Sequence, residues 1–293
     1  LTHSYATLHR KEIYPANFNP TPTHRFFQLL DEKNMLLRVY TQNIDTLERQ
    51  TGMSGDKVIE CHGSYATNTC LTCGQKYSQK WFKDKIFNVD SKNNNNSNNG
   101  KKLEEKATAT MTVIPTCDNC DGIVKPDITF YGENLPEIFG RMYKNDVQSA
   151  DALIVLGTSL QVYPVAGIVD LVRPDIPRIL INRDCVHRAN YMGKVSKGTF
   201  EISTDGFWFG KKELDKHNYR DIFVQGDCDE VIKNICKDLN WDEELNTLLK
   251  KKDSKGNNSG HKNNSNNNGV EDDKKRGNGN DLSAMIDNLS IKE

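Results

Sequence analysis

The sequence lacks any long apolar run and any marked excess of charge. Of its 293 residues, 36% are hydrophobic and 27% are charged, and the formal net charge is -1 at pH 7. No apolar stretch reaches the roughly 18 residues that suggest a membrane span. Sequence-independent nucleic-acid binding needs a concentrated basic surface, which this charge balance does not indicate. We therefore expect no membrane segment and no direct nucleic-acid partner.

The start of the chain also lacks several features. It begins at Leu1 without an initiator Met, shows no charged-then-apolar leader, and has no glycine before Gly52. We expect a cytosolic or nuclear setting, which is reducing. In that setting the eight cysteines favour metal binding over disulfides. The length suffices for one large α/β domain or for two small ones.

Two CxxC pairs are the most specific local pattern. Their members are Cys70, Cys73, Cys117 and Cys120. Each pair brings two thiolates to one point, so two pairs supply the four sulfur ligands of a tetrahedral structural zinc. Four sulfurs leave no coordination position for a substrate water, so such a zinc holds the structure together and does no chemistry. Cys61 is a competing ligand, but its spacing is wrong for this kind of turn.

Four short apolar segments, typical of buried strands, each end in polar or glycine-containing sequence. The segments and their ends are 36–41 with Gln42, Asn43, Ile44 and Asp45; 152–156 with Gly157, Thr158 and Ser159; 178–181 with Asn182, Arg183 and Asp184; and 221–224 with Gly226, Asp227 and Cys228. Helical patterns lie between them, so we expect an α/β fold with a doubly wound parallel sheet, covered by helices on both faces. Because the carboxyl ends of parallel strands share one edge, we expect a nucleotide-sized site there.

Helices are expected around these strands, and two segments are expected to be disordered. Thr21 or Thr23 is suited to cap a helix over residues 23–30, in which His24 is a capping or packing residue. The Asn-rich stretch at about 88–112 and the tail at 251–293 cannot bury enough apolar area to offset their ordering entropy.

Six motifs occur in an order that resembles one known family. They are Gln42-Asn43-Ile44-Asp45, His62-Gly63, the two CxxC pairs, Lys125-Pro126-Asp127 through Gly132-Glu133, and Gly157-Thr158-Ser159-Leu160-Gln161-Val162. From about Tyr5 to Lys250 the chain resembles the sirtuins, the NAD-dependent protein-lysine deacylases, and most closely their cytosolic tubulin-deacetylase branch. The resemblance implies a Rossmann-like NAD-binding domain at 1–62 and 134–250, with a zinc module inserted at 63–133.

The resemblance also implies roles for individual residues. His62 and Asn43 would be catalytic, with His62 the general base that takes a proton from a ribose hydroxyl of NAD, as suits a side chain whose unperturbed pKa lies near neutrality. The residues at the four strand ends would bind the cofactor, with Gln42 to Asp45 on its nicotinamide side. The acyl-lysine peptide would add as a strand along Thr129, Phe130, Tyr131, Gly132, Glu133, Gln161 and Val162.

The implied reaction consumes NAD and gives nicotinamide, free lysine and O-acyl-ADP-ribose. Its partners would be acyl-lysine proteins such as tubulin or histones. One alternative is a catalytically silent, zinc-containing module that binds acyl-lysine peptides, although peptide binding alone requires neither His62 nor Asn43. Another is a zinc-ribbon nucleic-acid binder, which the net charge of -1 disfavours.

The sequence departs from the family pattern at its start. Family members carry a first strand, a Gly-Ala-Gly turn and an Asp-Phe-Arg loop that bind the pyrophosphate and close over the nicotinamide. None of these precedes Gln42. We therefore expect the native protein to begin upstream of Leu1, and the chain as written to bind NAD poorly.

Overall fold

The computed structural model describes residues 18–87, 114–188, 195–196, 199–200, 206–209, 218 and 220–250. The Asn-rich stretch and the tail lie outside these residues. The chain divides into two compact units: unit 1 holds Leu1–Asn19, Tyr40–Leu47 and Glu60–Glu137, and unit 2 holds Pro20–Val39, Glu48–Ile59 and Ile138–Glu293. Within the described ranges, no helix has both the length and the apolar character needed to cross a membrane.

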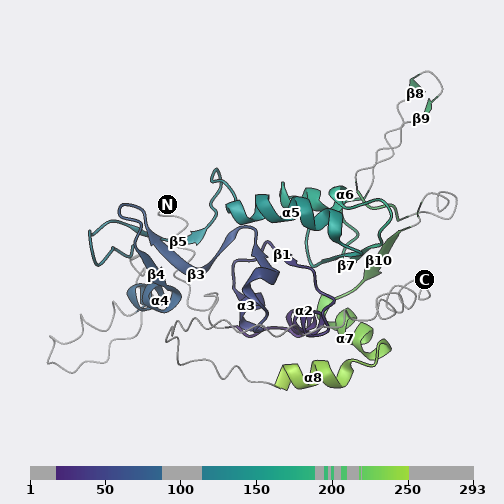
Figure 1. The fold of residues 1–293 in the computed structure, drawn as a ribbon, viewed down its shortest axis with the longest axis horizontal. Coiled ribbons are helices and arrows are strands. Elements are labelled where there is room, and N and C mark those ends of the chain that lie inside the picture. The colour runs from purple at the N-terminus through teal and green to yellow at the C-terminus, as the bar shows by residue number, and fades with distance from the viewer. Residues whose placement is uncertain are drawn as a thin grey trace, which may run out of the picture. The chain divides into compact units, whose positions relative to one another are not determined.

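The elements follow one another as the alternating sequence pattern predicts (Figure 1). The α-helices are α2 (Pro22–Glu32), α3 (Leu47–Gln50), α4 (Gln79–Phe87), α5 (Glu137–Ser149), α6 (Ile168–Leu171), α7 (Cys228–Asp238) and α8 (Asp242–Lys250). The strands are β1 (Val39–Thr41), β2 (Val58–Glu60), β3 (Gly63–Cys70), β4 (Lys76–Ser78), β5 (Val124–Ile128), β6 (Leu153–Leu156), β7 (Arg178–Asn182), β8 (Val195–Ser196), β9 (Thr199–Phe200) and β10 (Asp221–Gln225). Two short 3-10 helices are η3 (Gly55–Lys57) and η5 (Val165–Gly167).

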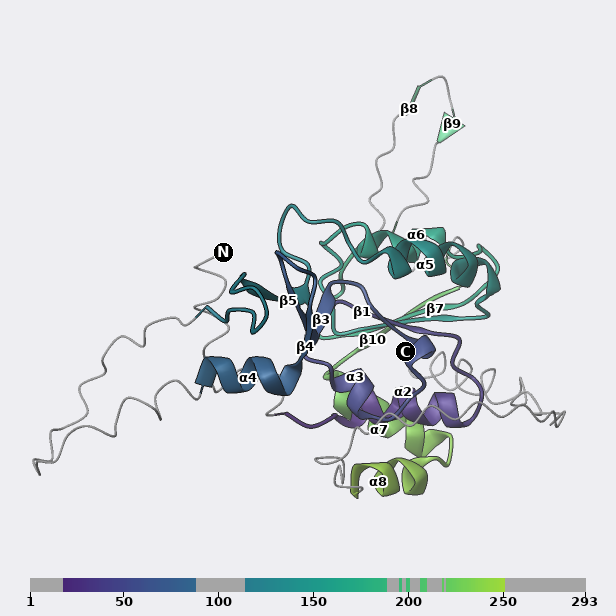
Figure 2. The same cartoon turned by 60° about the vertical axis from the view of Figure 1, so that its left-hand side comes forward.

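Unit 2 is built on a three-stranded parallel sheet in the order β10-β7-β6. Ile181 of β7 lies opposite Leu156 of β6 on one side and Val224 of β10 on the other. Figure 2 shows α5 and α6 on one face of this sheet and α2, α7 and α8 on the other. The predicted parallel sheet with helices on both faces is confirmed.

The central strand β7 supplies both halves of the core because successive side chains of a strand point to opposite faces. Ile179 and Ile181 belong to the buried cluster formed with α2, α7 and α8. Leu180, between them, belongs to a second cluster with Ala166 and Val169. These three β7 side chains are fully buried, which explains why the sequence at 179–181 is continuously apolar.

The strand predicted at 36–41 differs from its prediction. β1 covers Val39–Thr41 rather than 36–41, and among the described residues it pairs with β2 and not with the parallel sheet. The backbone N–H of Cys61 donates to the Thr41 carbonyl at 2.9 Å, and the Lys57 ammonium donates to the Leu36 carbonyl at 2.8 Å. The backbone around β1 is therefore bound by the segment at 57–61. The ends of β6, β7 and β10 therefore share one sheet edge, whereas the end of β1 belongs to a separate two-stranded sheet with β2.

A carboxylate from α7 caps α2. Asp229 Oδ1 accepts hydrogen bonds from Thr21 Oγ1 at 2.9 Å, from the Thr23 backbone N–H at 3.0 Å and from Thr23 Oγ1 at 2.6 Å. His24 Nδ1 accepts from the Thr21 backbone N–H at 3.2 Å. Of the two roles predicted for His24, capping or packing, the structure shows capping, and the cap also ties the first turns of two helices together.

Unit 1 contains a three-stranded antiparallel sheet in the order β4-β3-β5, with α4 packed beside it. Its buried cluster consists of Phe82 and Ile86 from α4, Val124 from β5, and the cysteines at positions 70 and 117. A core of this size is small for an independent unit, and units of this kind generally need a metal or disulfides for stability.

Arg178 fixes the amino ends of two parallel strands. Its side chain is 0% exposed and donates to both carboxylate oxygens of Asp221, at 2.6 and 2.5 Å. It also donates to the carbonyls of Val169 at 2.9 Å and Gly206 at 2.8 Å. Because Arg178 and Asp221 are register partners of β7 and β10, this ion pair joins the two strands, and the carbonyl contacts tie α6 and the segment at 206 to them.

Replacing Arg178 by Met should lower the free energy of unfolding by about 3–5 kcal/mol, because the buried Asp221 carboxylate loses its two-point ion pair and keeps only Arg220, at 3.9 Å, as a counter-charge. The measurement is urea unfolding followed by circular dichroism. Arg141→Met, at an exposed position of α5, is the control and should change the free energy by no more than about 0.5 kcal/mol. Equal stability of the two variants would contradict the role of the buried pair.

Candidate functional site

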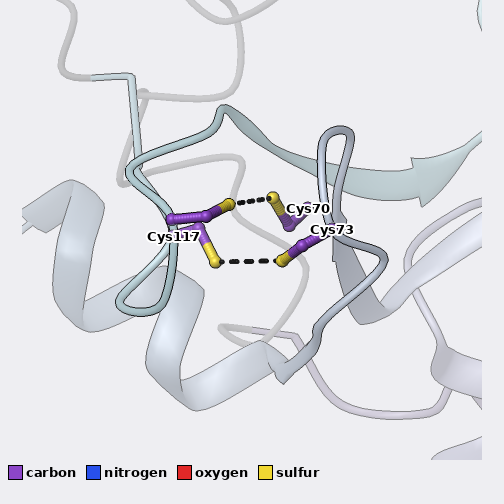
Figure 3. A group of neighbouring side chains, drawn as sticks. Cys70, Cys73 and Cys117 are labelled. Atoms are coloured by element: carbon purple, nitrogen blue, oxygen red, sulfur yellow. Dashed lines mark hydrogen bonds between the residues drawn. The ribbon is translucent and has the colours of Figure 1, made fainter.

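Four cysteine sulfurs converge in unit 1. The Sγ atoms of Cys70, Cys73, Cys117 and Cys120 all lie within 4.8 Å of one another. The Sγ–Sγ distance is 3.6 Å between Cys70 and Cys120, and also between Cys73 and Cys117. Figure 3 shows the labelled sulfurs facing one another from two turns. Tetrahedral zinc with Zn–S bonds of about 2.3 Å requires sulfurs about 3.8 Å apart, so this donor set fits a structural zinc.

Local backbone geometry forms the two turns. The Thr72 backbone N–H donates to Cys70 Sγ, and the Asn119 backbone N–H donates to Cys117 Sγ, both at 3.4 Å. At Gly122 an added Cβ would lie 2.4 Å from Thr72 Oγ1 and 3.0 Å from Cys70 Sγ. The second turn can therefore approach the first only because residue 122 has no side chain.

One of these sulfurs has a further hydrogen-bond partner. The hydroxyl of Tyr77 lies 3.0 Å from Cys117 Sγ. This contact lowers the pKa of the Cys117 thiol to about 6 and raises the pKa of Tyr77 to about 12. Both shifts favour a thiolate at Cys117 beside a neutral tyrosine, and thiolate is the form that binds a metal.

His62 lies next to the start of β3, and its ring orientation is set by a backbone carbonyl. The Nδ1 atom is 3.1 Å from the Gln42 carbonyl oxygen. Because a carbonyl only accepts hydrogen bonds, Nδ1 of the neutral ring carries the proton and Nε2 presents its lone pair. The Thr129 backbone N–H donates to the His62 carbonyl at 2.8 Å. One candidate base thus lies beside residues predicted to bind both the cofactor and the peptide.

Gly63 makes this arrangement possible. Its φ is +68°, and an added Cβ would lie 2.0 Å from the Asp127 carbonyl oxygen. Gly63 is also the register partner of Ile128 across β3 and β5. The chain therefore turns directly after His62 in a conformation that needs glycine.

The predicted peptide-binding loop after β5 is shaped by a lysine. Lys125 Nζ donates to the Ile128 carbonyl at 2.7 Å and to Glu133 Oε2 at 2.9 Å, and it lies 4.5 Å from the centroid of the Phe130 ring. The Phe130 backbone N–H also donates to the Glu133 carboxylate, at 2.9 Å. The pKa of Glu133 is lowered mainly by the hydrogen bond from the Phe130 backbone N–H and, to a lesser extent, by the contact with Lys125. Tyr131 is fully exposed at the tip of this loop.

The other predicted residues of unit 1 lie between β1 and α3. Asp45 Oδ1 accepts from the Leu47 backbone N–H at 3.1 Å and so begins α3. The Asn43 backbone N–H donates to Thr41 Oγ1 at 3.1 Å, while the Asn43 side chain is exposed. Ile44 is half-buried, and its carbonyl accepts from the Tyr65 backbone N–H.

In unit 2, the predicted residues at the ends of β6, β7 and β10 do converge. Asn182 Nδ2 donates to the Thr158 carbonyl at 3.1 Å and to the Asp184 carbonyl at 2.9 Å. The Gly226 backbone N–H donates to the Asn182 carbonyl at 3.0 Å. A Cβ added at Gly157 would lie 3.4 Å from Cys228 Sγ. The expected meeting of strand ends at one sheet edge is observed for these three strands.

Charged groups line the same edge. Arg183 donates to Asp227 Oδ2 at 2.7 Å, which lowers the pKa of the Asp227 carboxyl and raises the pKa of Arg183. Burial, chiefly, raises the pKa of the Cys228 thiol. Ser159, Gln161 and Val162 are exposed. The edge therefore presents hydrogen-bonding groups around a glycine, as a nucleotide-sized site requires.

Three side chains around the zinc cluster were not predicted as functional. Tyr77, Trp81 and Asp118 contact one another or the cluster. The spacing of Tyr77 and Trp81, four residues apart, indicates a shared helical or turn face. Nothing in the sequence indicates that Tyr77 meets a cysteine 40 positions later, because that contact depends on how β4 pairs with β3.

The fold and these sites define an α/β protein that combines a doubly wound parallel sheet with a four-cysteine unit. The sequence profile of the Sir2 family matches residues 2–164. The chain belongs to the Sir2 family, and the resemblance found from its motifs is confirmed.

Several curated proteins are similar to this chain. NAD-dependent deacetylase sir2C of Dictyostelium discoideum is 40% identical over 242 residues. NAD-dependent protein deacetylase sirtuin-2 of Danio rerio is 36% identical, and NAD-dependent protein deacetylase HST2 of Candida albicans is 35% identical, each over 243 residues. Each alignment covers 82% of this chain but 46%, 56% and 59% of the relative, respectively. The chain therefore spans about half the length of the curated relatives it matches.

Replacing Cys73 by Ala should release zinc and unfold unit 1, because structural zinc supplies on the order of 10 kcal/mol of folding free energy. The measurements are zinc content by a colorimetric chelator and the melting temperature. Cys185→Ala, outside the cluster, is the matched control and should keep its zinc. A Cys73→Ala protein with full zinc content and an unchanged melting temperature would exclude the structural zinc.

Replacing Gly63 by Ala should destabilise the protein by about 2 kcal/mol or more, because alanine is strained at this φ and its Cβ meets the Asp127 carbonyl. Urea unfolding measures the change. Gly140→Ala is the control, since a Cβ there meets nothing within 4 Å. Because alanine favours a helix interior over glycine, this variant should raise the free energy of unfolding by about 0.5–1 kcal/mol. A neutral Gly63→Ala would show that the chain can turn after His62 without glycine.

Proposed function

We propose that this chain is part of an NAD-dependent protein-lysine deacylase that releases nicotinamide and transfers the acyl group of a lysine to ADP-ribose. One observation carries the proposal: the Gln42 carbonyl, 3.1 Å from His62 Nδ1, sets the histidine tautomer that leaves Nε2 ready to accept a proton. A general base needs this tautomer, because the ring nitrogen that accepts the proton must present a lone pair.

Bound NAD supplies an electrophilic ribose carbon when nicotinamide leaves. In the proposed mechanism, His62 accepts a proton from a ribose hydroxyl at Nε2 while the Gln42 carbonyl stabilises the charge that forms on the ring. Asn43 and Asp45 orient the nicotinamide side. On the adenosine side, we assign binding to the strand ends around Gly157 and Cys228.

The peptide is assigned to the loop after β5. Thr129 is held against the His62 carbonyl by its own N–H, so a peptide strand that pairs with this loop would place its acyl-lysine near the proposed base. The ion pair between Lys125 and Glu133, at 2.9 Å, stabilises the conformation of this loop. Gln161 and Val162 are proposed to contact the same peptide from the segment after β6.

Zinc has a structural role in this proposal. Four sulfurs occupy all its positions, so Cys70, Cys73, Cys117 and Cys120 would hold it without leaving a site for water.

We further infer that the substrates are acyl-lysine proteins of the tubulin or histone kind, and that the protein acts in the cytosol or nucleus. Two of the relatives are named NAD-dependent protein deacetylases and a third an NAD-dependent deacetylase, which supports a protein substrate.

Replacing His62 by Tyr should reduce nicotinamide release from NAD and an acetyl-lysine peptide by at least ~100-fold, because it removes the general base. The assay uses the protein at its native length, with the 293-residue chain in parallel. His24→Gln is the matched control, since His24 caps α2, and it should keep parent activity.

Zinc content and peptide binding are measured on the same samples. Equal turnover in parent and His62→Tyr would contradict the assignment of the base. Peptide binding without nicotinamide release by the native-length protein would favour the silent peptide-binding module.

A further inference from the structure

Tyr77 lies beside the four-cysteine cluster in a position that defines its role as a donor. Its hydroxyl oxygen is 3.0 Å from Cys117 Sγ and accepts a hydrogen bond from the Asp118 backbone N–H at 2.9 Å. The tyrosine has one proton to give, and its oxygen already accepts from Asp118. A metal-bound cysteine is a thiolate, which carries no proton. The O–H of Tyr77 therefore points at the sulfur.

Helix α4 holds this tyrosine in place. The Tyr77 ring stacks on Trp81, with centroids 3.8 Å apart and an interplanar angle of 22°. Trp81 Nε1 donates to Asp118 Oδ2 at 2.7 Å, and Lys85 Nζ donates to Asp118 Oδ1 at 2.7 Å. Both carboxylate oxygens of Asp118, the residue after the ligand Cys117, are thus bound by α4.

Lys85 contacts Trp81 as well as Asp118. Lys85 Nζ also lies 5.1 Å from the centroid of the Trp81 ring, a cation–π distance. The ion pair between Lys85 and Asp118 is exposed, so we expect it to add little by itself. The two hydrogen bonds that fix direction are those from Trp81 to Asp118 and from Tyr77 to Cys117.

We propose that Tyr77 is a positioning residue of the metal centre, whose hydroxyl donates to the Cys117 thiolate while Trp81 and Asp118 hold it there, so that α4 controls how long zinc stays bound. Four thiolates around one Zn²⁺ leave an excess of negative charge, and a hydrogen bond to one sulfur reduces it. Hydrogen bonds to metal ligands typically change metal affinity by ~10–100-fold.

The test is zinc release from the full chain into excess chelator. Tyr77→Phe keeps the ring and its stack on Trp81 but removes the hydroxyl, and should release zinc ~10-fold faster than the parent. Tyr143→Phe, in α5 of the other unit, is the matched control. Tyr143 stacks on Phe139, so the same atom is deleted from a stacked tyrosine outside the four-cysteine unit, and the zinc release rate should equal that of the parent.

Cobalt substitution adds a readout that packing alone does not change. A hydrogen bond stabilises the sulfur lone pairs, so its loss in Tyr77→Phe should shift the sulfur-to-cobalt charge-transfer band to lower energy. Trp81→Phe keeps an aromatic ring and the tyrosine hydroxyl but removes the Nε1–H. It should release zinc faster than the parent with a charge-transfer band close to that of the parent.

Three outcomes would overturn the proposal. A parent-like release rate in Tyr77→Phe would show that the hydroxyl does not hold the metal. Faster release with an unshifted cobalt band would show that Tyr77 acts through the Asp118 N–H and not through the sulfur. If Tyr77→Phe does not fold, a parent-like release rate in Trp81→Phe would exclude control by α4.

Discussion

The convergence of four cysteine sulfurs within 4.8 Å is the constraint on which the rest of unit 1 depends. Four thiolates this close repel one another strongly in a partly buried site, and a dication removes that cost. Among the described residues of unit 1, the buried cluster around them contains few apolar side chains, with Phe82 and Val124 among them. We therefore expect metal binding and folding to be coupled in this unit, as is general where an apolar core is small.

The same ladder that ends at the metal begins at the proposed base. β3 starts at Gly63 opposite Ile128 and ends at Cys70 opposite Val124. The Thr129 backbone N–H then bonds to the His62 carbonyl. A structural metal at one end of two paired strands thus stabilises the backbone at the other end, where the histidine and the proposed peptide loop lie. This gives zinc an influence on the proposed chemistry although it would bind no substrate.

In unit 2, the amino ends of the parallel strands contribute to stability, whereas their carboxyl ends carry the residues proposed to bind. The buried Arg178–Asp221 pair closes the amino ends of β7 and β10. The carboxyl ends carry glycine and polar residues, which contribute little to packing. Because packing and the ion pair stabilise the strands elsewhere, residues such as Asn182 and Asp227 can be kept for hydrogen bonding at the edge.

The sequence by itself determined the fold class, the grouping of the four cysteines and the convergence of three strand ends, because each depends on local spacing or on alternation that any parallel sheet imposes. It did not determine that β1 pairs with β2, since a short apolar segment is compatible with either sheet. Nor did it determine the Gln42–His62 hydrogen bond or the contact of Tyr77 with Cys117. Those contacts join residues that are distant in the chain, and only the packing of the tertiary structure decides which of them meet.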